Sequence, residues 1–104
     1  MIRHTVLFTI KPETSENELK SIFQEVKQWQ DTVSGVLSIV CGKCSYQEGK
    51  GIENFIHGFS IDFVDQKSLN DFFVDENTSG LKFKLVNLIV NGIDGIHGFE
   101  FSDI

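Results

Sequence analysis

The sequence has no long apolar run and no segment of biased composition. No stretch approaches the ~20 apolar residues that a membrane-spanning helix needs. The broken apolar run after Met1 is too short and too regularly alternating for a signal peptide. Neither an internal linker nor a repeat of roughly 20–50 residues is present. We therefore expect residues 1–104 to form a single domain in the cytosol.

Positive charge is also scarce. The chain carries 9 basic and 15 acidic residues, which gives a formal charge of −6. No cluster contains more than two neighbouring Lys or Arg residues. Because an acidic protein repels nucleic-acid phosphates and anionic lipids, the composition argues against nucleic acid and membrane surfaces as partners.

Cysteine is limited to Cys41 and Cys44. The two residues form a C-x-x-C pair within a predicted strand, where side chains three apart point to opposite faces. This placement suits neither a disulfide nor a shared metal ion. We expect two unconnected thiols, one of them buried and the other near a loop.

The signatures of cofactor binding and covalent catalysis are missing as well. Gly42-Lys43 and Gly49-Lys50 lack the rest of a P-loop, and the chain has no G-x-S-x-G sequence. Gly92, Gly95 and Gly98 follow a helical pattern instead of preceding one, so they are turn glycines. We expect no cofactor.

Phenylalanine, by contrast, is abundant. The chain has ten Phe residues, and each could contribute roughly 1.5–3 kcal/mol when fully buried. So much aromatic volume in a small domain indicates a thick core, an apolar pocket or a buried subunit interface. Composition does not choose among these three.

The hydrophobic pattern changes between two periods along the chain. Alternation predicts strands at residues 2–10, 36–45, 54–63 and 96–101. Helical spacing predicts helices at about residues 15–30 and 66–73, followed by an interruption at 75–80 and another helical stripe at 81–89. Ser15 and Asp65 are the predicted helix caps. The predicted fold class is α+β, a ferredoxin-like βαββαβ arrangement with a four-stranded antiparallel sheet and the helices on one face.

All three histidines lie in the alternating runs. Because side chains two apart share a face, His4, His57 and His97 each group with neighbouring aromatic and aliphatic side chains, His97 with Phe99 and Phe101. We expect all three on the buried face of the sheet. A buried imidazole costs free energy unless its nitrogens find partners, so these positions are either site candidates or hydrogen-bonded core residues.

A metal site built from these histidines is not expected. Antiparallel pairing of the first and third strands places His4 and His57 towards opposite ends of the sheet. No Asp or Glu shares their face, so the ligand set is incomplete.

The other face of the predicted sheet has a mixed character. Leu7, Ile39 and Ile56 form an apolar centre there, among Thr, Ser and Gly residues. Such a centre is typical of a sheet that packs against another sheet. We therefore expect a homodimer in which both copies contribute this face.

Several motifs, taken together, resemble a known family. Residues 3–12 (RHTVLFTIKP) form a His-x-hydrophobic strand followed by Lys-Pro, residues 35–38 (GVLS) open the second strand, and residues 55–59 (FIHGF) contain the third-strand histidine. Phe63 and Leu69 follow at the entry to the second helix. In this order they resemble the stress-responsive α/β-barrel domain (Dabb) family over nearly the whole chain. The resemblance implies a dimeric α/β barrel in which two four-stranded sheets face each other.

The resemblance also implies an activity. A polyketide (olivetolic acid) cyclase of this family closes a linear polyketide by aldol condensation, which needs a general base and a group that polarises a carbonyl. His4 and His57 match pocket histidines of that enzyme. The Tyr and His expected to carry its chemistry are Phe72 and Thr78 here. Phe72 lacks the hydroxyl and Thr78 is no base near neutral pH, which favours a protein without this catalysis.

Three hypotheses remain from the sequence. The first is a homodimeric barrel whose small apolar pocket, between sheet and helices, binds a small hydrophobic molecule. The second is a lyase- or cyclase-type enzyme with His4 or His57 as base, and the third is a structural protein whose only partner is itself. Asp75 and Glu76 are expected in a solvated loop or at the lip of the pocket. The predicted pocket residues are His4, Phe8, Phe23, His57, Phe59 and Phe72.

Overall fold

A four-stranded sheet with helices on one side forms the molecule. The computed structural model describes residues 1–44 and 56–103. The strands are β1 (Ile2–Phe8), β2 (Val36–Lys43), β3 (His57–Phe63) and β4 (His97–Ser102). The helices are α1 (Glu16–Thr32), α2 (Gln66–Val74), α3 (Glu76–Asn87) and the short 3-10 helix η1 (Gly92–Gly95).

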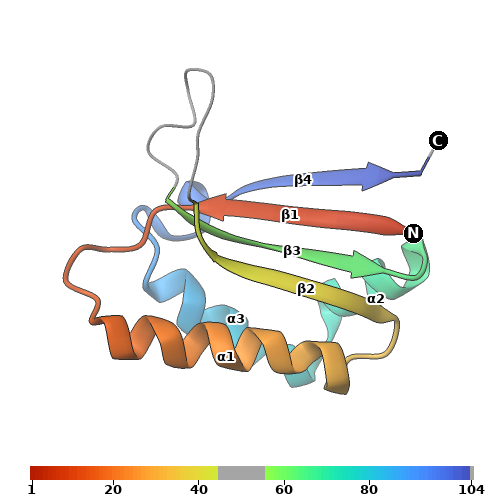
Figure 1. The fold of residues 1–104 in the computed structure, drawn as a ribbon, viewed down its shortest axis with the longest axis horizontal. Coiled ribbons are helices and arrows are strands. Elements are labelled where there is room, and N and C mark those ends of the chain that lie inside the picture. The colour runs from red at the N-terminus through yellow and green to blue at the C-terminus, as the bar shows by residue number, and fades with distance from the viewer. Residues whose placement is uncertain (45–55, 104) are drawn as a thin grey trace.

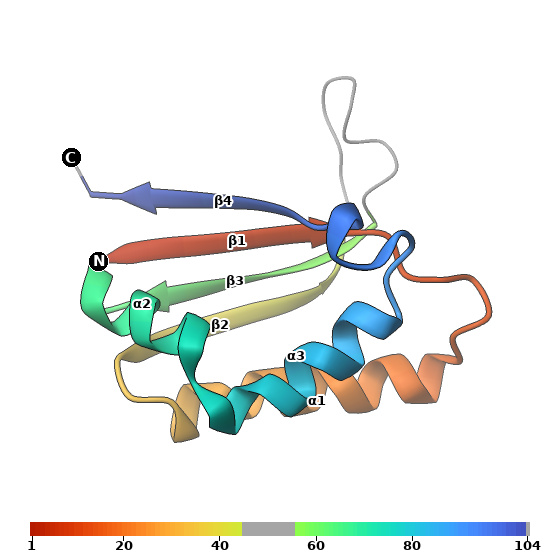
Figure 2. The ribbon, with the colours of Figure 1, turned by 180° about the vertical axis from the view of Figure 1, so that it is seen from behind.

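The strands are antiparallel and lie in the order β2-β3-β1-β4. Helices α1, α2 and α3 all lie on the same side of this sheet (Figures 1 and 2). No described element covers the other side, which we call the open face. The predicted α+β, ferredoxin-like fold is confirmed.

The first two helices begin at the predicted caps. Ser15 Oγ accepts the main-chain N–H of Glu18 at 3.1 Å, and Asp65 Oδ1 accepts that of Ser68 at 2.8 Å. Each cap satisfies a donor that has no partner within the first helical turn. These bonds fix the residues at which α1 and α2 begin.

The predicted interruption between the two helical stripes exists but is confined to Asp75, so its predicted extent over residues 75–80 was wrong. Asp75 alone separates α2 from α3, and its carboxylate accepts the main-chain N–H of Asn77 at 2.9 Å. An Asp at this position is a strong N-cap, so the polar residues after it start a helix. Glu76 is the first residue of α3, and Gly80 lies within that helix.

The core consists of two neighbouring groups of side chains between sheet and helices. One group lies under β2 and β3, and the other under β1. Phe59 and Leu81 contact both groups. The buried members are Val26, Trp29, Ile39, Ile61, Phe63, Leu69 and Phe72 in the first group and Val6, Phe8, Ile10, Ile22, Leu85 and Ile89 in the second.

A bulge in β2 changes the face of Ile39. The register against β3 shifts between Val36 and Ser38, which inserts one extra residue into β2. Val36 and Ile39 therefore both pack towards the helices, and Ile39 is only 5% exposed. The prediction that Ile39 lies on the open face was wrong. Val40, which is 72% exposed, lies on that face instead.

The aromatic side chains of β4 lie on the open face of the sheet and not on the predicted, helix-covered face. His97 pairs with Leu7 and Phe99 with Thr5, and paired residues point to the same side of a sheet. The side chains of His97, Phe99 and Phe101 therefore lie on the open face, and all three are exposed. The prediction that they belong to the buried face was wrong.

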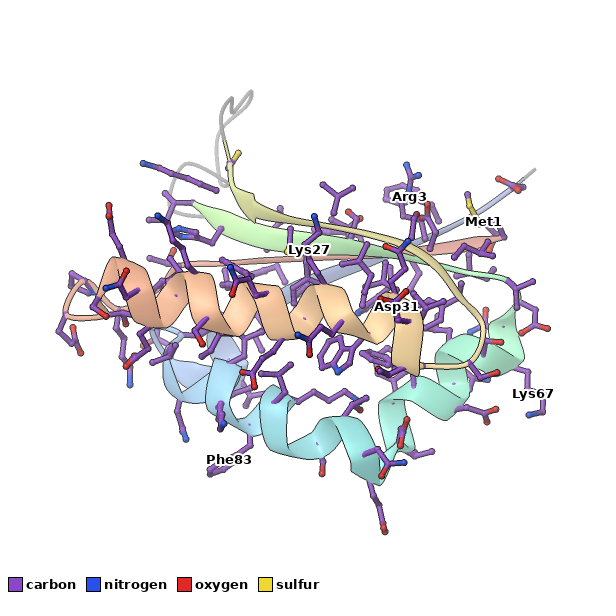
Figure 3. The ribbon with its side chains drawn as sticks, turned by 60° about the horizontal axis from the view of Figure 1, so that its bottom comes forward. Met1, Arg3, Lys27, Asp31, Lys67 and Phe83 are labelled. Carbon is purple, nitrogen blue, oxygen red and sulfur yellow. The ribbon has the colours of Figure 1, made fainter. Side chains whose placement is uncertain are left out.

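The open face also carries an ion pair at one end. Arg3 donates to Asp62 through Nε at 2.7 Å and Nη2 at 3.0 Å, and Ser38 Oγ donates to the same carboxylate at 3.0 Å. Figure 3 shows Arg3 on the side of the sheet away from the helices. The Arg3 hydrogen bonds, helped by Ser38, hold the pKa of Asp62 below its usual range.

An apolar cavity beside His4 and Lys82

A cavity of about 270 Å³ lies between the sheet and helices α2 and α3. Its walls are hydrophobic side chains, with His4 and Lys82 as the two ionisable groups in the lining. Cavities of this kind, apolar with a few polar groups, are the usual form of small-molecule sites. The lining residues are His4, Val6, Phe8, Trp29, Phe59, Phe72, Phe73, Lys82, Leu85, Val86, Ile89, Ile93 and Ile96.

His4 reaches the cavity from the middle of β1. Its ring lies edge-on to Phe73, with the centroids 5.2 Å apart and the planes at 90°. Gly98 of β4 leaves room beside the imidazole, because a Cβ added there would lie 3.5 Å from His4 Cε1. The strand pairing and this glycine together hold the ring on the helix-covered face.

The Nδ1 atom of His4 is buried and has no hydrogen-bond partner among the described residues. Glu100 Oε1 is 4.0 Å away, which is too far for a hydrogen bond but close enough for Coulombic attraction. Burial lowers the pKa of His4, and the attraction of Glu100 only partly opposes this effect. The imidazole is therefore neutral at pH 7, where it can accept or donate one hydrogen bond.

Lys82 enters the cavity from α3. Its Nζ donates to the main-chain oxygen of Phe72 and lies 4.0 Å from the centre of the Phe72 ring. Burial lowers the pKa of Lys82, and the more distant Asp75 carboxylate acts in the opposite direction. The side chain thus holds its charge against an aromatic ring and a carbonyl at the end of α2.

Four of the six predicted pocket residues line this cavity: His4, Phe8, Phe59 and Phe72. Phe23 and His57 do not line it. They stack on each other at the opposite end of the sheet, with ring centroids 6.1 Å apart. Burial and the nearby Lys43 lower the pKa of His57, and its Nδ1 is buried without a partner among the described residues.

The two residues at the positions of the cyclase Tyr and His, Phe72 and Thr78, do not lie in the same site. Phe72 lines the cavity and packs edge-on against Trp29 at 5.1 Å between centroids. Thr78 is 2% exposed and donates its hydroxyl to the main-chain oxygen of Asp75 at 3.0 Å, away from the cavity lining. Asp75 and Glu76 do not line the cavity either, so the expected pocket lip is not formed by them there.

Nine of the thirteen lining residues were not predicted for the pocket, among them Lys82, which contacts Phe72, and Phe73, which contacts His4. Phe73 is 50% exposed and reads as the edge of an apolar stripe, although it contacts His4. Lys82 resembles any solvated lysine of a helix. Its position three residues before Leu85, a residue of the apolar stripe, is the signal that places it near the core side.

The described residues show neither a metal centre nor a membrane-spanning helix. Within residues 1–44 and 56–103, no group of three or more His, Cys, Asp or Glu side chains could hold a metal ion. No helix in this part of the chain is both long enough and apolar enough to cross a bilayer. Cys41 and Cys44 are both half-buried thiols, so the prediction that one of them is buried was wrong. Cys41 Sγ donates to the main-chain oxygen of Phe23 at 3.7 Å.

Solved structures share this fold over nearly the full chain length. A dimeric ferredoxin-like protein of unknown function from Jannaschia sp. CCS1 is 20% identical, covers 98% of both chains and gives a TM-score of 0.84. A Dabb family protein from Mesorhizobium loti is 21% identical, covers 99% of this chain and 96% of its own, and gives 0.74. Hydroxynitrile lyase from Passiflora edulis is 15% identical, with coverages of 99% and 94% and a TM-score of 0.74.

At these identities the solved structures establish the fold alone. No curated protein is similar enough to the sequence to count as a match. The model of the stress responsive A/B barrel domain matches residues 2–91, from β1 to the end of the α3 region. Because this match covers most of the sequence, the chain belongs to the stress responsive A/B barrel domain (Dabb) family.

Proposed function

We propose that the protein binds a small hydrophobic molecule in the cavity beside His4. The observation that carries this proposal is the lining itself, in which apolar side chains surround a space of about 270 Å³. A half-open space of this size with hydrophobic walls favours an apolar occupant over water, because water needs several polar partners. His4 and Lys82 are the two ionisable side chains in the lining beside which such a molecule would lie.

Trp29 provides a direct way to test this binding. It is the sole tryptophan of the chain and lines the cavity. We expect titration with 1-octanol to change its fluorescence in a saturable manner. Val86→Phe should abolish the change, because the larger side chain fills the cavity that Val86 lines. Val74→Phe is the matched control, since Val74 is 78% exposed and lies outside the lining.

The outcome that contradicts this proposal is equally specific. If wild-type fluorescence does not saturate with 1-octanol, the cavity does not accept an apolar molecule. If Val74→Phe and Val86→Phe weaken binding equally, the alcohol binds elsewhere. Circular dichroism of both variants distinguishes these results from loss of the fold.

We further propose that the protein is a homodimer in the cytosol, with the open faces of two copies packed together. Val40, Phe99 and Phe101 are all exposed on this face of one copy. A sheet face with several exposed apolar side chains is typical of an interaction surface. The predicted contribution of Leu7 and Ile56 stays part of this proposal, whereas Ile39 is replaced by Val40. Two solved structures of this fold are described as dimeric, which supports a dimer of this chain without specifying the face that forms it.

A second candidate function is proton abstraction in the same cavity, with His4 as the base. The observation that favours it is a neutral, buried imidazole whose Nδ1 has no partner among the described residues. His57 is a weaker candidate base, because it does not line this cavity. The absence of a hydroxyl on Phe72 leaves carbonyl polarisation without the group expected from the cyclase.

Exchange chemistry separates this candidate from simple binding. A base at His4 should catalyse incorporation of deuterium from D2O next to the carbonyl of 2-octanone, and His4→Gln should remove that activity. The retention of 1-octanol binding by His4→Gln would show that the cavity is intact. Exchange that is the same in both proteins would exclude His4 as the base.

A further inference from the structure

We propose that the molecule bound in the cavity is an amphipathic anion, a carboxylate on an apolar chain, and that Lys82 binds its charged end. This inference rests on the proposed function, because it assumes that the cavity is a ligand site. It goes further by assigning the charge of the ligand and the residue that recognises it.

The first step concerns the partners of Lys82. Its ammonium group contacts the main-chain oxygen and the ring of Phe72, and both of these are uncharged. Among the described residues, no carboxylate oxygen lies within 4.0 Å of Nζ. The half-buried charge of Lys82 therefore forms no ion pair with a described residue, and the more distant Asp75 carboxylate is the counter-charge that attracts it.

The second step concerns the free energy of that arrangement. Removing an ammonium ion from water is unfavourable unless an opposite charge compensates for the lost hydration. The lowered pKa of Lys82 has this cause, since burial outweighs the attraction of Asp75. A carboxylate bound beside Nζ would restore the compensation through a charge-assisted hydrogen bond.

The third step concerns the orientation of the ligand. His4 lies against Phe73, Lys82 lies against Phe72, and the centroids of these two rings are 6.1 Å apart. Glu100 is 4.0 Å from His4 Nδ1, so a second carboxylate near His4 would be repelled. The charged end of the ligand therefore belongs at Lys82, and its apolar or neutral part belongs near His4.

Two ligands of equal chain length test this charge assignment. We expect octanoate to bind the wild-type protein about tenfold or more tightly than 1-octanol, as a hydrogen bond to a charged group predicts. Trp29 fluorescence reports both titrations. Lys82→Met should remove the preference for octanoate over 1-octanol, whereas Lys82→Arg should retain that preference.

Lys84→Met is the matched control, because Lys84 lies on the same helix, is exposed and does not line the cavity. It should keep the wild-type preference. If wild-type protein binds octanoate no more tightly than 1-octanol, the charge assignment fails while the apolar site stands. If neither compound binds, the proposed function itself fails. If Lys84→Met loses the preference as completely as Lys82→Met, general protein charge is responsible and the inference is overturned.

Discussion

His4 and Asp62 lie on opposite faces of one sheet, and their pKa values are lowered for different reasons. Asp62 accepts three hydrogen bonds from Arg3 and Ser38, which stabilise its charged form. His4 is buried beside apolar side chains, which disfavours its charged form. Asp62 is therefore an anion held in place by its partners, and His4 is a neutral ring in the cavity lining.

The two buried histidines predict how stability depends on pH. The folded-state pKa values of His4 and His57 are lowered, so the unfolded chain binds more protons as pH falls through its own value of about 6.5. The free energy of unfolding should be highest above that pH and should decrease between about pH 7 and pH 5. Urea unfolding across this interval should show the decrease, and the His4→Gln/His57→Gln double variant should show a flatter profile.

Direct titration by NMR gives the control for this prediction. The ring signals of His4 and His57 should change at a lower pH in the folded protein than in urea. A wild-type protein that becomes more stable on acidification over the same interval would contradict the assigned direction for both residues.

At the scale of elements, sequence patterns predicted where strands and helices lie better than which side they present. The stripe of α1 is as predicted, with Ile22, Val26 and Trp29 buried. In β4, alternation shows only that residues 97, 99 and 101 share a face. The assignment of that face assumed that apolar side chains point to the helices. That assumption fails here because the open face is itself apolar in part.

Local irregularities are the other reason why sequence reasoning was incomplete. The bulge in β2 has no clear sequence signal, yet it moves Ile39 from one face to the other. The cavity depends on the same kind of detail. His4, Phe8, Phe59 and Phe72 were identified because they lie on predicted buried positions, whereas Lys82 depends on how α3 packs against the end of α2.

Substitution by alanine should change the free energy of unfolding in opposite directions at two glycines, one in a connecting segment and one in a helix. Gly35, before β2, has φ +85°, and a Cβ there would lie 2.2 Å from Ser68 Oγ. Gly35→Ala should therefore destabilise the protein by about 1–3 kcal/mol. Gly80 lies within α3 with open space around its added Cβ, so Gly80→Ala should stabilise by about 0.5–1 kcal/mol. Urea unfolding of both variants checks the two signs, and a shared direction would refute the argument.

At the scale of the whole molecule, the proposed dimer would bury one exposed apolar side chain and leave another in solvent. Val40 is 72% exposed on the open face, and Phe83 is 69% exposed on the outer side of α3 (Figure 3). We expect sedimentation velocity to show a dimer at micromolar concentration. Val40→Lys should dissociate it, because the substitution places a charge in the interface.

Phe83→Lys is the control for this experiment, since it adds the same charge to a surface outside the proposed interface. That variant should sediment as a dimer. A monomeric wild-type protein, or dissociation by both substitutions, would rule out the open face as the specific contact.

The strand order β2-β3-β1-β4 also determines when the sheet can be completed during synthesis. Ile2 pairs with Phe63 and Ser102, so β1 is synthesised well before both of the strands with which it pairs. Three strands and all three α-helices can assemble before β4 arrives. Until then β1 is an edge with unpaired backbone groups, able to pair with another chain. The pairing of β4 with β1 thus removes an edge at which another chain could otherwise add a strand.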